Sequence, residues 1–390
     1  MRKGWEYKKL GEICSSDLGK TLNKSKDVGN MRPYLCAINI LWDSIDLTTL
    51  KEACFKDDEI DRYTVKYGDL LVCEGGDTGR AAIWDRKEPI LYQNALHRLR
   101  FKEDVDARFI MYNLWHKKQI GEIDHKYSKG VTILHLVKSA LLSIPILLPP
   151  LSTQLAIVSE LDKINELIRL KKEQLKDFDN LAQSLFYEMF GDPVENEKGW
   201  EVKKLGEIGE FKNGLNFSKD ENGHSIKFLG VSDFQNKKSI ASDQLAYISL
   251  SERVQEDYLL KTGDIVFVRS NGKKELIGRS VKMYITEPTT YSGFCIRCRI
   301  TDEKVDKDYI AILLKTPIIR QFMTNSGRGC NISNLNQKVL NSIPTILPPL
   351  SLQRLFAQRI EQIEREKSEV QKSIQDLETL QASRMQYWFE

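Results

Sequence analysis

Gly4–Ile13, which reads GWEYKKLGEI, returns almost unchanged as Gly199–Ile208, GWEVKKLGEI, with nine identities in ten residues. A second segment, Leu141–Gln154 (LLSIPILLPPLSTQ), returns as Leu340–Gln353 (LNSIPTILPPLSLQ), with ten identities in fourteen. The offset between the copies grows from 195 to 199 residues. Weaker echoes between these markers place the four extra residues in a loop near 270–275. The chain is therefore a tandem repeat of two domain-sized units, which excludes a solenoid of short repeats.

Each copy ends in a segment that predicts one long helix. The segment follows Leu-Pro-Pro-Leu-Ser, whose prolines stop any preceding element and whose serine, Ser152 or Ser351, suits a helix N-cap. Gly and Pro are then absent until Gly191 in the first copy and do not recur in the second. Apolar residues in a heptad register predict a helix of about 38 residues, roughly 57 Å long at ~1.5 Å per residue.

The apolar seams predict that the two long helices pair with each other. A single amphipathic helix of this length would leave its seam in water, and a whole domain between the helices allows them to run antiparallel. The two globular domains are then expected at opposite ends of a rod, related by an approximate two-fold axis. Lys171 and Lys367 interrupt the seams, either as snorkelling stems or as residues that set the helix register. The seam positions expected at the helix or partner interface are Ile157, Leu161, Ile164, Ile168, Leu175, Phe178, Ile360, Ile363, Val370, Ile374 and Leu377.

The rest of each copy predicts an α+β domain. Its readable strands are rich in β-branched, aromatic or alternating residues and are bounded by Gly turns: Leu70–Cys73, Ala95–Phe101, Ile265–Val268 and Phe294–Ile300. Short helices are expected at Ala107–Gln119 and Lys307–Thr324. The predicted order is a first globular domain over 1–150, a first long helix over 151–190, a linker over 191–198, a second globular domain over 199–350 and a second long helix over 351–390.

Composition excludes several classes of protein. With 41% hydrophobic and 29% charged residues the chain is typical of globular proteins, and no apolar run reaches the ~18 residues of a membrane span. The first ten residues lack the apolar core of a signal peptide, so a cytoplasmic location is expected, and seven irregularly spaced cysteines indicate reduced thiols. The net charge of +3 is unevenly distributed: +3 and +5 over the two globular domains, and −4 and −1 over the two helical segments. Two basic domains fit a polyanionic partner.

The chain resembles the DNA-specificity subunit of Type I restriction–modification systems over essentially its whole length. The resemblance rests on an ordered set of motifs, most of which occur twice: W-x-x-K-K-L-G-E, G-D-[LI]-[LV], G-x-x-I-x-x-L and I-P-x-x-L-P-P-L-x-x-Q, with FYEMFGD at Phe186–Asp192. The second copy departs from the last motif, since it reads MQYWFE at 385–390.

The resemblance implies two variable target-recognition domains held apart by two antiparallel helices. Each domain reads one half of a split DNA sequence, and because the two domains differ, the target is an asymmetric bipartite one. The implied partners are double-stranded DNA, two modification subunits that carry the methyl donor, and optionally restriction subunits. No cofactor, metal or catalytic residue is implied for this chain itself.

Two pairs of loops are the candidate DNA contacts. Residues 75–80 and 269–274 follow equivalent strands, are rich in Gly and polar residues, and differ between the copies; residues 127–132 and 326–331 form the second pair. Gly beside Lys or Arg suits a close approach to phosphate, and solvated turns are the alternative. The candidate DNA-binding residues are Thr78, Arg80, Lys129, Thr132, Arg269, Asn271, Lys273, Lys274, Arg328 and Asn331.

For other conspicuous residues the structural interpretation is favoured. The Trp residues that open the repeats are expected to be core anchors, and arginines that recur in both copies are expected to be structural or phosphate-binding, since readers of different sequences share them. A core or hairpin role is favoured over base contact for Gln93, Asn94 and His97. A zinc site at Cys295-x-x-Cys298 is disfavoured, because residues i and i+3 of a strand point to opposite faces. The tryptophans are Trp5 and Trp200, and the recurring arginines are Arg98, Arg100, Arg297 and Arg299.

Two other functions are compatible with parts of the sequence. A stand-alone DNA-modifying enzyme is disfavoured, because the chain has no phosphate-cradling G-x-x-x-x-G-K-[ST], no Asn/Asp-Pro-Pro-aromatic signature and no clustered histidines. A coiled-coil scaffold that binds only proteins is compatible with the helices, but the two basic domains with divergent loops disfavour it. Salt-dependent binding to duplex DNA separates the specificity subunit from the scaffold.

Overall fold

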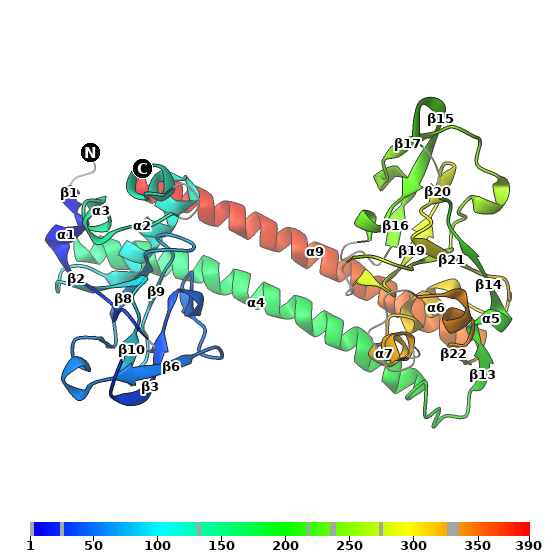
Figure 1. Cartoon of the computed structure of the whole chain (residues 1–390), viewed down its shortest axis with the longest axis horizontal. Helices are drawn as coiled ribbons and strands as arrows, with labels where there is room; N and C mark the ends of the chain where they lie inside the picture. The colour runs from blue at the N-terminus through cyan, green and yellow to red at the C-terminus, as the bar shows by residue number, and fades with distance from the viewer. Residues whose placement is uncertain are drawn as a thin grey trace. The chain divides into compact units, whose positions relative to one another are not determined.

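The computed structural model describes residues 4–23, 27–130, 134–216, 219–234, 239–272, 276–325 and 335–390. The chain divides into two compact units. Unit 1 comprises Met1–Glu173 and Gln371–Glu390, and unit 2 comprises Gln174–Val370. Each unit thus contains one α+β domain, one part of the first long helix, α4 (Leu151–Phe190), and one part of the second, α9 (Leu350–Phe389), as Figure 1 shows.

In unit 1 the described strands form two four-stranded sheets, ordered β6-β3-β10-β7 and β2-β11-β8-β9, and two small pairs, β1-β12 and β4-β5. The strands are β1 (Glu6–Lys9), β2 (Cys14–Leu18), β3 (Asn30–Leu35), β4 (Ile40–Leu41), β5 (Ser44–Ile45), β6 (Lys51–Phe55), β7 (Thr64–Val65), β8 (Leu70–Cys73), β9 (Ala81–Ile83), β10 (Ile90–Tyr92), β11 (Leu96–Phe101) and β12 (Pro145–Leu148). The short helices are α1 (Leu10–Ile13), α2 (Ala107–Gln119) and α3 (Lys138–Leu142), with single turns η1 (Ala37–Asn39), η2 (Asp57–Glu59) and η3 (Ile123–Tyr127).

Unit 2 repeats this plan. Its described strands form sheets ordered β14-β21-β18-β19-β16, β17-β15-β20 and β13-β22. The strands are β13 (Glu201–Lys204), β14 (Gly209–Asn213), β15 (Lys219–Leu229), β16 (Ser239–Ala241), β17 (Tyr247–Leu250), β18 (Ile265–Val268), β19 (Ser280–Tyr284), β20 (Thr289–Tyr291), β21 (Cys295–Ile300) and β22 (Pro344–Leu347). The helices are α5 (Leu205–Ile208), α6 (Lys307–Leu313), α7 (Pro317–Asn325) and α8 (Gln337–Asn341), with turns η4 (Val231–Asp233), η5 (Ser242–Gln244) and η6 (Glu256–Tyr258). The α+β class and the internal repeat predicted from the sequence are confirmed.

Five of the six short elements predicted from the sequence agree with the structure to within one residue, and the sixth is wrong. β8, β18 and α2 have the predicted bounds, and the strands predicted from Ala95 and Phe294 begin one residue later. The single helix expected over Lys307–Thr324 is instead two helices, α6 and α7, because Pro317 has no amide hydrogen to continue α6 and begins α7 instead.

The two long helices follow the predicted heptad register within each unit. Most of the predicted seam residues are buried, and Leu175, Phe178 and Leu377 are half-buried. In unit 1, Lys172 of α4 pairs with Glu378 of α9 at 2.8 Å, and Arg384 pairs with Glu160. Because the residue number rises on one helix as it falls on the other, the two segments run antiparallel. The buried seam residues are Ile157, Leu161, Ile164, Ile168, Ile360, Ile363, Val370 and Ile374.

In unit 2 the same antiparallel pairing includes one of the lysines that interrupt the seam. The ammonium group of Lys367 lies 2.5 Å from the carboxylate of Asp179 on α4. This bond joins the two helices across the seam, which favours the register-setting interpretation of Lys367. None of the helices in the described part of the chain is long and apolar enough to cross a membrane.

The helix entry differs from the prediction in a small way. Ser152 and Ser351 are not N-caps but lie in the first turn, because each helix begins at the preceding leucine. The amide of Thr153 donates to the carbonyl of Pro150 over 2.8 Å, and the second copy repeats this bond. The proline carbonyl thus takes the first helical hydrogen bond.

A glutamine shared by both copies ties each long helix to its domain. In unit 1 the buried side chain of Gln154 donates to the carbonyls of Pro149 and Asp104 and accepts from the amide of Asp106, the N-cap of α2. Gln353 makes the same three types of bond in unit 2. The glutamine that ends the repeated I-P-x-x-L-P-P-L-x-x-Q motif therefore joins the long helix to the N-terminus of the short helix beside it, α2 or α6.

The hydrophobic core of each domain is continuous with the helix pair. In unit 1 the ring of Phe389 on α9 packs edge-on to Phe109 of α2 at 5.5 Å between centroids, and Trp388 stacks on Trp5 at 6.5 Å. In unit 2 the buried ring of Phe356 on α9 contacts Phe186 and Phe190 of α4 and Tyr309 of α6. The helices therefore complete the domain cores instead of only connecting them.

This arrangement predicts the effect of emptying the unit 2 junction. The substitution Phe356→Ala should lower the free energy of unfolding of unit 2 by about 3–5 kcal/mol, because it removes a fully buried ring with three aromatic neighbours. The neighbouring Leu355, which is 39% exposed, is the control, and Leu355→Ala should cost less than about 1 kcal/mol. Urea unfolding followed by tryptophan fluorescence measures both changes. Equal losses for the two variants would contradict a shared core at this junction.

Candidate nucleic-acid interface

The two loops of unit 1 that were predicted independently as DNA contacts lie side by side. Gly75 forms an antiparallel β-bridge with His135, and so does Lys129. The amide of Leu136 donates to the carbonyl of Glu74 over 2.7 Å. The loop after β8 and the loop before α3 are therefore held together by backbone hydrogen bonds.

Unit 2 has the corresponding bond. The amide of Leu335 donates to the carbonyl of Arg269 over 2.8 Å, which joins the chain before α8 to the loop after β18. Of the unit 2 loops predicted from the sequence, the structure describes 269–272. The same pairing in both units places the loop after β8 or β18 beside the described chain that leads into α3 or α8.

Two further segments complete this surface in both units. In unit 1 the turn before β11 joins the surface, because the amide of Glu74 donates to the carbonyl of Ala95 over 2.8 Å. In unit 2 the turn before β21 joins it in the same way, because the amide of Arg269 donates to the carbonyl of Phe294 over 2.8 Å. The chain after β2 joins through the bond from Asn94 to Lys20, and the chain after β14 through the bond from Gly293 to Leu215. We call this surface the loop edge: residues 18–21, 74–80, 93–95, 127–130 and 134–136 in unit 1, and 213–216, 269–272, 292–294 and 335 in unit 2.

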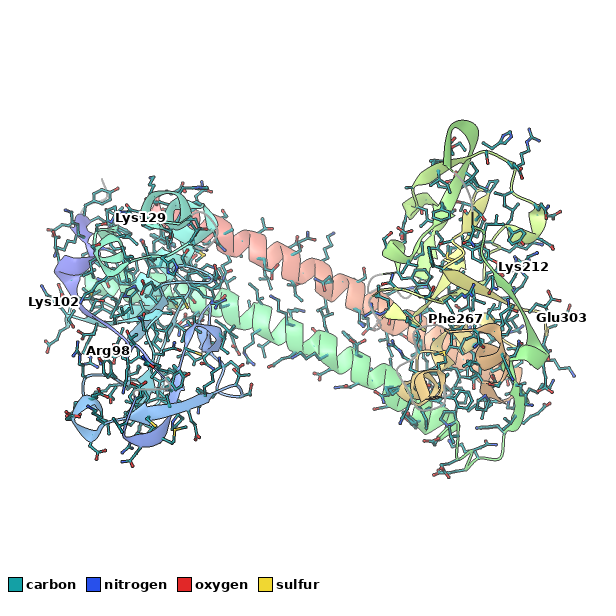
Figure 2. The ribbon with its side chains drawn as sticks, viewed as in Figure 1. Arg98, Lys102, Lys129, Lys212, Phe267 and Glu303 are labelled. Atoms are coloured by element: carbon teal, nitrogen blue, oxygen red, sulfur yellow. The ribbon has the colours of Figure 1, made fainter. Side chains whose placement is uncertain are left out.

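The predicted residues in unit 1 have different surroundings. Lys129 is exposed, whereas the Arg80 guanidinium is partly buried and donates to the carbonyl of Ala37 over 2.9 Å. Thr78 is 1% exposed, and its hydroxyl donates to Asp124 over 2.8 Å. The Thr78 side chain therefore anchors the loop to η3 and offers no surface to a ligand, whereas Lys129 lies at the surface of the unit (Figure 2).

A cluster of three charged side chains, Lys118, Asp77 and Asp124, joins the loop after β8 to α2 and η3. Lys118 of α2 contacts Asp77 at 2.9 Å and Asp124 at 2.8 Å. Burial tends to raise the pKa of Asp124, but the hydrogen bonds from Lys118 and Thr78 outweigh burial and hold the pKa below its usual value. The Asp124 carboxylate is thus ionised at neutral pH, and its ion pair with Lys118 fixes the loop on α2.

In unit 2, Arg269 and Asn271 are both half-exposed on the loop that follows β18. The remaining predicted contacts, Thr132, Lys273, Lys274, Arg328 and Asn331, lie outside the described residues, as does part of the four-residue insertion.

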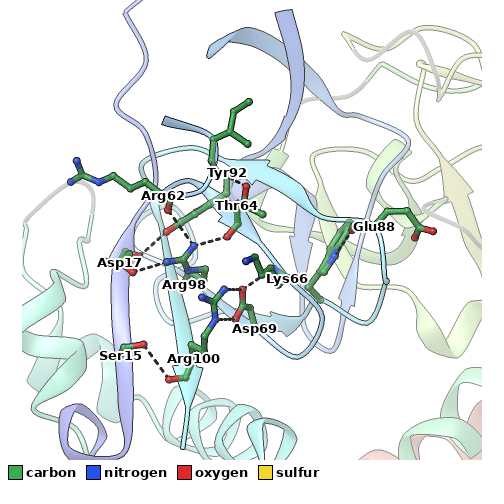
Figure 3. A network of polar contacts seen from close by, with 12 residues as sticks. Ser15, Asp17, Arg62, Thr64, Lys66, Asp69, Glu88, Tyr92, Arg98 and Arg100 are labelled. Atoms are coloured by element: carbon green, nitrogen blue, oxygen red, sulfur yellow. Dashed lines mark hydrogen bonds and ion pairs between the residues drawn. The ribbon is translucent and has the colours of Figure 1, made fainter. Parts of the chain in front are cut away.

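The arginines shared by the two copies are bound to the protein itself. In unit 1 the guanidinium of Arg100 donates two hydrogen bonds of 2.7 and 2.6 Å to Asp69, whose side chain is 2% exposed (Figure 3). Arg299 makes the same bidentate contact with Asp264 in unit 2, at 2.8 and 2.7 Å. The structural interpretation of these arginines is supported.

These contacts also explain the repeated Gly-Asp motif. Gly68 and Gly263 have φ values of +85° and +92°, a conformation that glycine adopts without strain. In each copy the following aspartate accepts the amide of the residue three positions earlier, at 2.7 Å, and thereby closes the turn. The buried carboxylate then binds the arginine of the neighbouring strand, which is Arg100 on β11 in unit 1 and Arg299 on β21 in unit 2. The motif is a joint between a turn and a strand and lies away from the loop edge.

Most other core predictions agree with the structure. Trp5 is 7% exposed, and Trp200 is half-buried with its indole N–H donated to the carbonyl of Phe190 over 2.9 Å. His97 is fully buried and contacts the carbonyl of Leu136 at 2.9 Å, and burial lowers its pKa, so the ring is neutral at pH 7. Gln93 and Asn94 lie half-buried in the turn at the loop edge.

The Cys295 and Cys298 pair is buried on β21. Burial raises the pKa of Cys295 to about 12 and that of Cys298 further still, so both thiols stay protonated. Among the described residues, no group of three or more His, Cys, Asp and Glu side chains could hold a metal ion.

Comparison with known proteins decides the family. The model of the Type I restriction modification DNA specificity domain matches residues 2–177 and again 197–379. The chain belongs to this family. As a specificity subunit it contributes DNA recognition to a restriction–modification complex and has no catalytic role of its own.

Individual relatives agree with this assignment. The Type I restriction enzyme MjaVIII specificity subunit of Methanocaldococcus jannaschii is 24% identical over 399 residues, which cover 95% of this chain and 90% of the relative. A solved structure of a Type I restriction–modification system matches 99% of the chain and 97% of its own with a TM-score of 0.64 and 17% identity. The S subunit of M. genitalium matches with a TM-score of 0.54 and 16% identity over 99% and 96% of the two chains. These structures support the fold.

The ion pairs between the shared arginines and buried aspartates lead to a prediction for this specificity subunit. Arg299→Met should destabilise unit 2 by about 2–3 kcal/mol, because it leaves the buried carboxylate of Asp264 without its bidentate partner. The second half of the recognised sequence should stay the same, since the Arg299 guanidinium is bound within unit 2 by Asp264 and by the carbonyl of Leu259. Thermal unfolding and methylation mapping measure the two effects, with Arg253→Met, an exposed arginine of the same unit, as the control. A relaxed second half-site in a stably folded Arg299→Met variant would show that Arg299 reads DNA.

Proposed function

We propose that this specificity subunit reads an asymmetric bipartite duplex sequence, with one half-site at the loop edge of each unit. The observation that carries this proposal is the construction of the two loop edges: the backbone bonds that build them are the same, whereas their sequences differ. A common frame with different side chains suits two readers of different base sequences. Lys129, Arg80, Arg269 and Asn271 are the described residues proposed to contact DNA, and Thr132, Lys273, Lys274, Arg328 and Asn331 are proposed from the sequence alone.

The division of labour follows from general rules of DNA recognition. Lys and Arg on phosphates supply affinity that is independent of sequence, and side chains at groove edges supply specificity. The net charges of +3 and +5 over the two domains support the first role. The divergent loops support the second.

We further propose that α4 and α9 set the separation of the two half-sites. Each helix has 40 residues, and the two are bonded to each other within both units. Two readers on such a helix pair contact the same side of a duplex when their half-sites are about one helical turn apart, ~34–36 Å. The bases between them are left unread.

The proposed partners are two modification subunits, which carry the methyl donor, and optionally restriction subunits, in the cytoplasm with the DNA. Exposed apolar side chains on α4 support such docking: Leu155, Leu167 and Leu170 are 49%, 48% and 46% exposed. Leu155 and Leu167 border an open groove of about 690 Å³. Exposed apolar side chains beside a groove are typical of a protein-binding surface.

The proposal predicts the outcome of a domain exchange. Replacing residues 1–150 with the corresponding segment of a relative that has another target should change one half of the methylated motif and leave the other half intact. Genome-wide mapping of methylated positions, in a host that also carries the modification subunits, measures this. The reciprocal exchange of residues 199–350 is the control and should change only the other half. A change in both halves after either exchange would refute independent reading.

A change in helix length tests the spacing role. Seven residues inserted into α4 after Glu173 and seven into α9 after Val370 keep the heptad register and lengthen the pair by roughly 10 Å at ~1.5 Å per residue. The spacer should grow by about three base pairs at ~3.4 Å each, with both half-sites unchanged. Methylation mapping again reads the result. An unaltered spacer in an assembled, active complex would exclude the helices as its determinant.

A further inference from the structure

One position of the loop edge carries very different side chains in the two units. Phe294, in the turn between β20 and β21, is 59% exposed, and it is the single exposed side chain in the described run from Tyr291 to Cys298. Ala95 occupies the equivalent position of the turn between β10 and β11. The two loop edges therefore differ at this point by a large aromatic ring.

The backbone around Phe294 is firmly held. Its carbonyl accepts hydrogen bonds from the amides of Arg269 and Ser270, at 2.8 and 3.4 Å, and its amide donates to the hydroxyl of Ser292 over 3.2 Å. Gly293 is packed so closely that an added Cβ would lie 2.1 Å from Oδ1 of Asn216. The turn presents the ring on a rigid support, which lowers the entropic cost of a contact made by the ring.

The position of the ring indicates its ligand. Its backbone is bonded directly to Arg269, which begins the loop proposed to contact DNA. The unit 1 turn is polar and small at the same place: Asn94 donates to the hydroxyl of Thr21 over 3.0 Å, and Ala95 follows. A phenylalanine side chain offers apolar contact and stacking but no hydrogen bond, and DNA provides surfaces for both in the thymine C5-methyl group and the faces of unstacked bases.

We propose that Phe294 is a specificity-determining residue of the second half-site, whose ring packs against the apolar surface of a base. This inference rests on the proposed function and adds the chemistry of one contact to it. The first half-site has no such contact, because Ala95 is too short to reach.

The test uses the complete complex of this chain with its modification subunits. Phe294→Ala should lower the affinity for duplexes that carry the methylated motif roughly tenfold or more and relax one position of the second half-site, with the first half-site unchanged. Phe294→Leu should retain part of both effects, since it keeps an apolar side chain. Tyr247→Ala is the matched control: Tyr247 is 58% exposed on β17 of the same unit and should behave like the wild type.

Modified duplexes distinguish the two kinds of apolar contact. If the ring packs on a methyl group, replacing one thymine of the second half-site with uracil weakens binding by the wild type and does not weaken Phe294→Ala further. If no such replacement matters while Phe294→Ala still relaxes the motif, the ring stacks on a base face.

The outcomes that overturn the inference are equally distinct. An unchanged motif and affinity in an assembled Phe294→Ala complex would show that the ring contacts no base. An unchanged motif combined with loss of assembly would assign the ring to a partner subunit. If the wild-type complex itself recognises no bipartite sequence, the proposed function fails, and this result is separate from the comparison of variants.

Discussion

The whole architecture depends on the burial of apolar side chains where each domain meets the helix pair. Phe356 in unit 2 and Phe389 in unit 1 belong to α9, yet each lies within the aromatic core of a different domain. A ring buried in this way contributes several kcal/mol to stability, a large part of the net stability of a domain. Neither domain can therefore lose its helices without losing part of its own core. Accordingly, both copies keep a phenylalanine at the end of the long helix, Phe190 and Phe389, and a tryptophan at the start of the repeat, Trp5 and Trp200.

The shared residues outside the junctions serve the same frame. The Gly-Asp turn with its arginine and the glutamine at the start of each long helix are polar joints that recur with nearly the same distances in both units. Their groups are mostly buried, and each has its hydrogen-bond partner, so a change of either partner leaves an unsatisfied group. The loop edge is different, because its backbone bonds fix its shape without constraining most of its side chains. Variation is tolerated there, as a reader of variable sequences requires.

The sequence predicted the fold well where a residue pattern has one physical cause. The repeat, the long helices with their seams, and strands such as Leu70–Cys73 follow from hydrophobic periodicity. The break at Pro317 was missed although proline is a strong local signal, since the apolar period continues across it. Pairings distant in sequence were not predictable in the same way: nothing in the order of residues says that Arg100 binds Asp69 or that Gln154 caps the turn before α2.

The candidate site was predicted only in part, for a related reason. Composition predicts which loops are candidates for DNA contact. The sequence does not show that the loop after β8 and the chain before α3 are neighbours, because their backbone hydrogen bonds join residues far apart in the chain. The polar loop around Thr78 predicts a DNA contact, but the Thr78 hydroxyl donates to Asp124 inside the protein. The sequence predicts Phe294 as the first residue of a strand, where an apolar side chain is normally buried. Only the observed exposure separates it from its buried neighbours.

The two units also show that one frame can be fastened to the helices by different chemistry. In unit 1, Arg108 of α2 pairs with Asp162 of α4 and with Asp43 of the β4-β5 hairpin, at 2.8 and 2.9 Å. Arg108 is the second residue after Asp106, the N-cap of α2, and the residue at this place in α6 is Asp308. Asp308 has the opposite charge and pairs with Lys282 of β19 inside its own domain. Partly buried ion pairs add little net stability because desolvation offsets their attraction, so such pairs can be exchanged while the aromatic junctions persist. The apolar contact therefore fixes where a domain sits on its helices, and the ion pairs around it are free to differ between the copies.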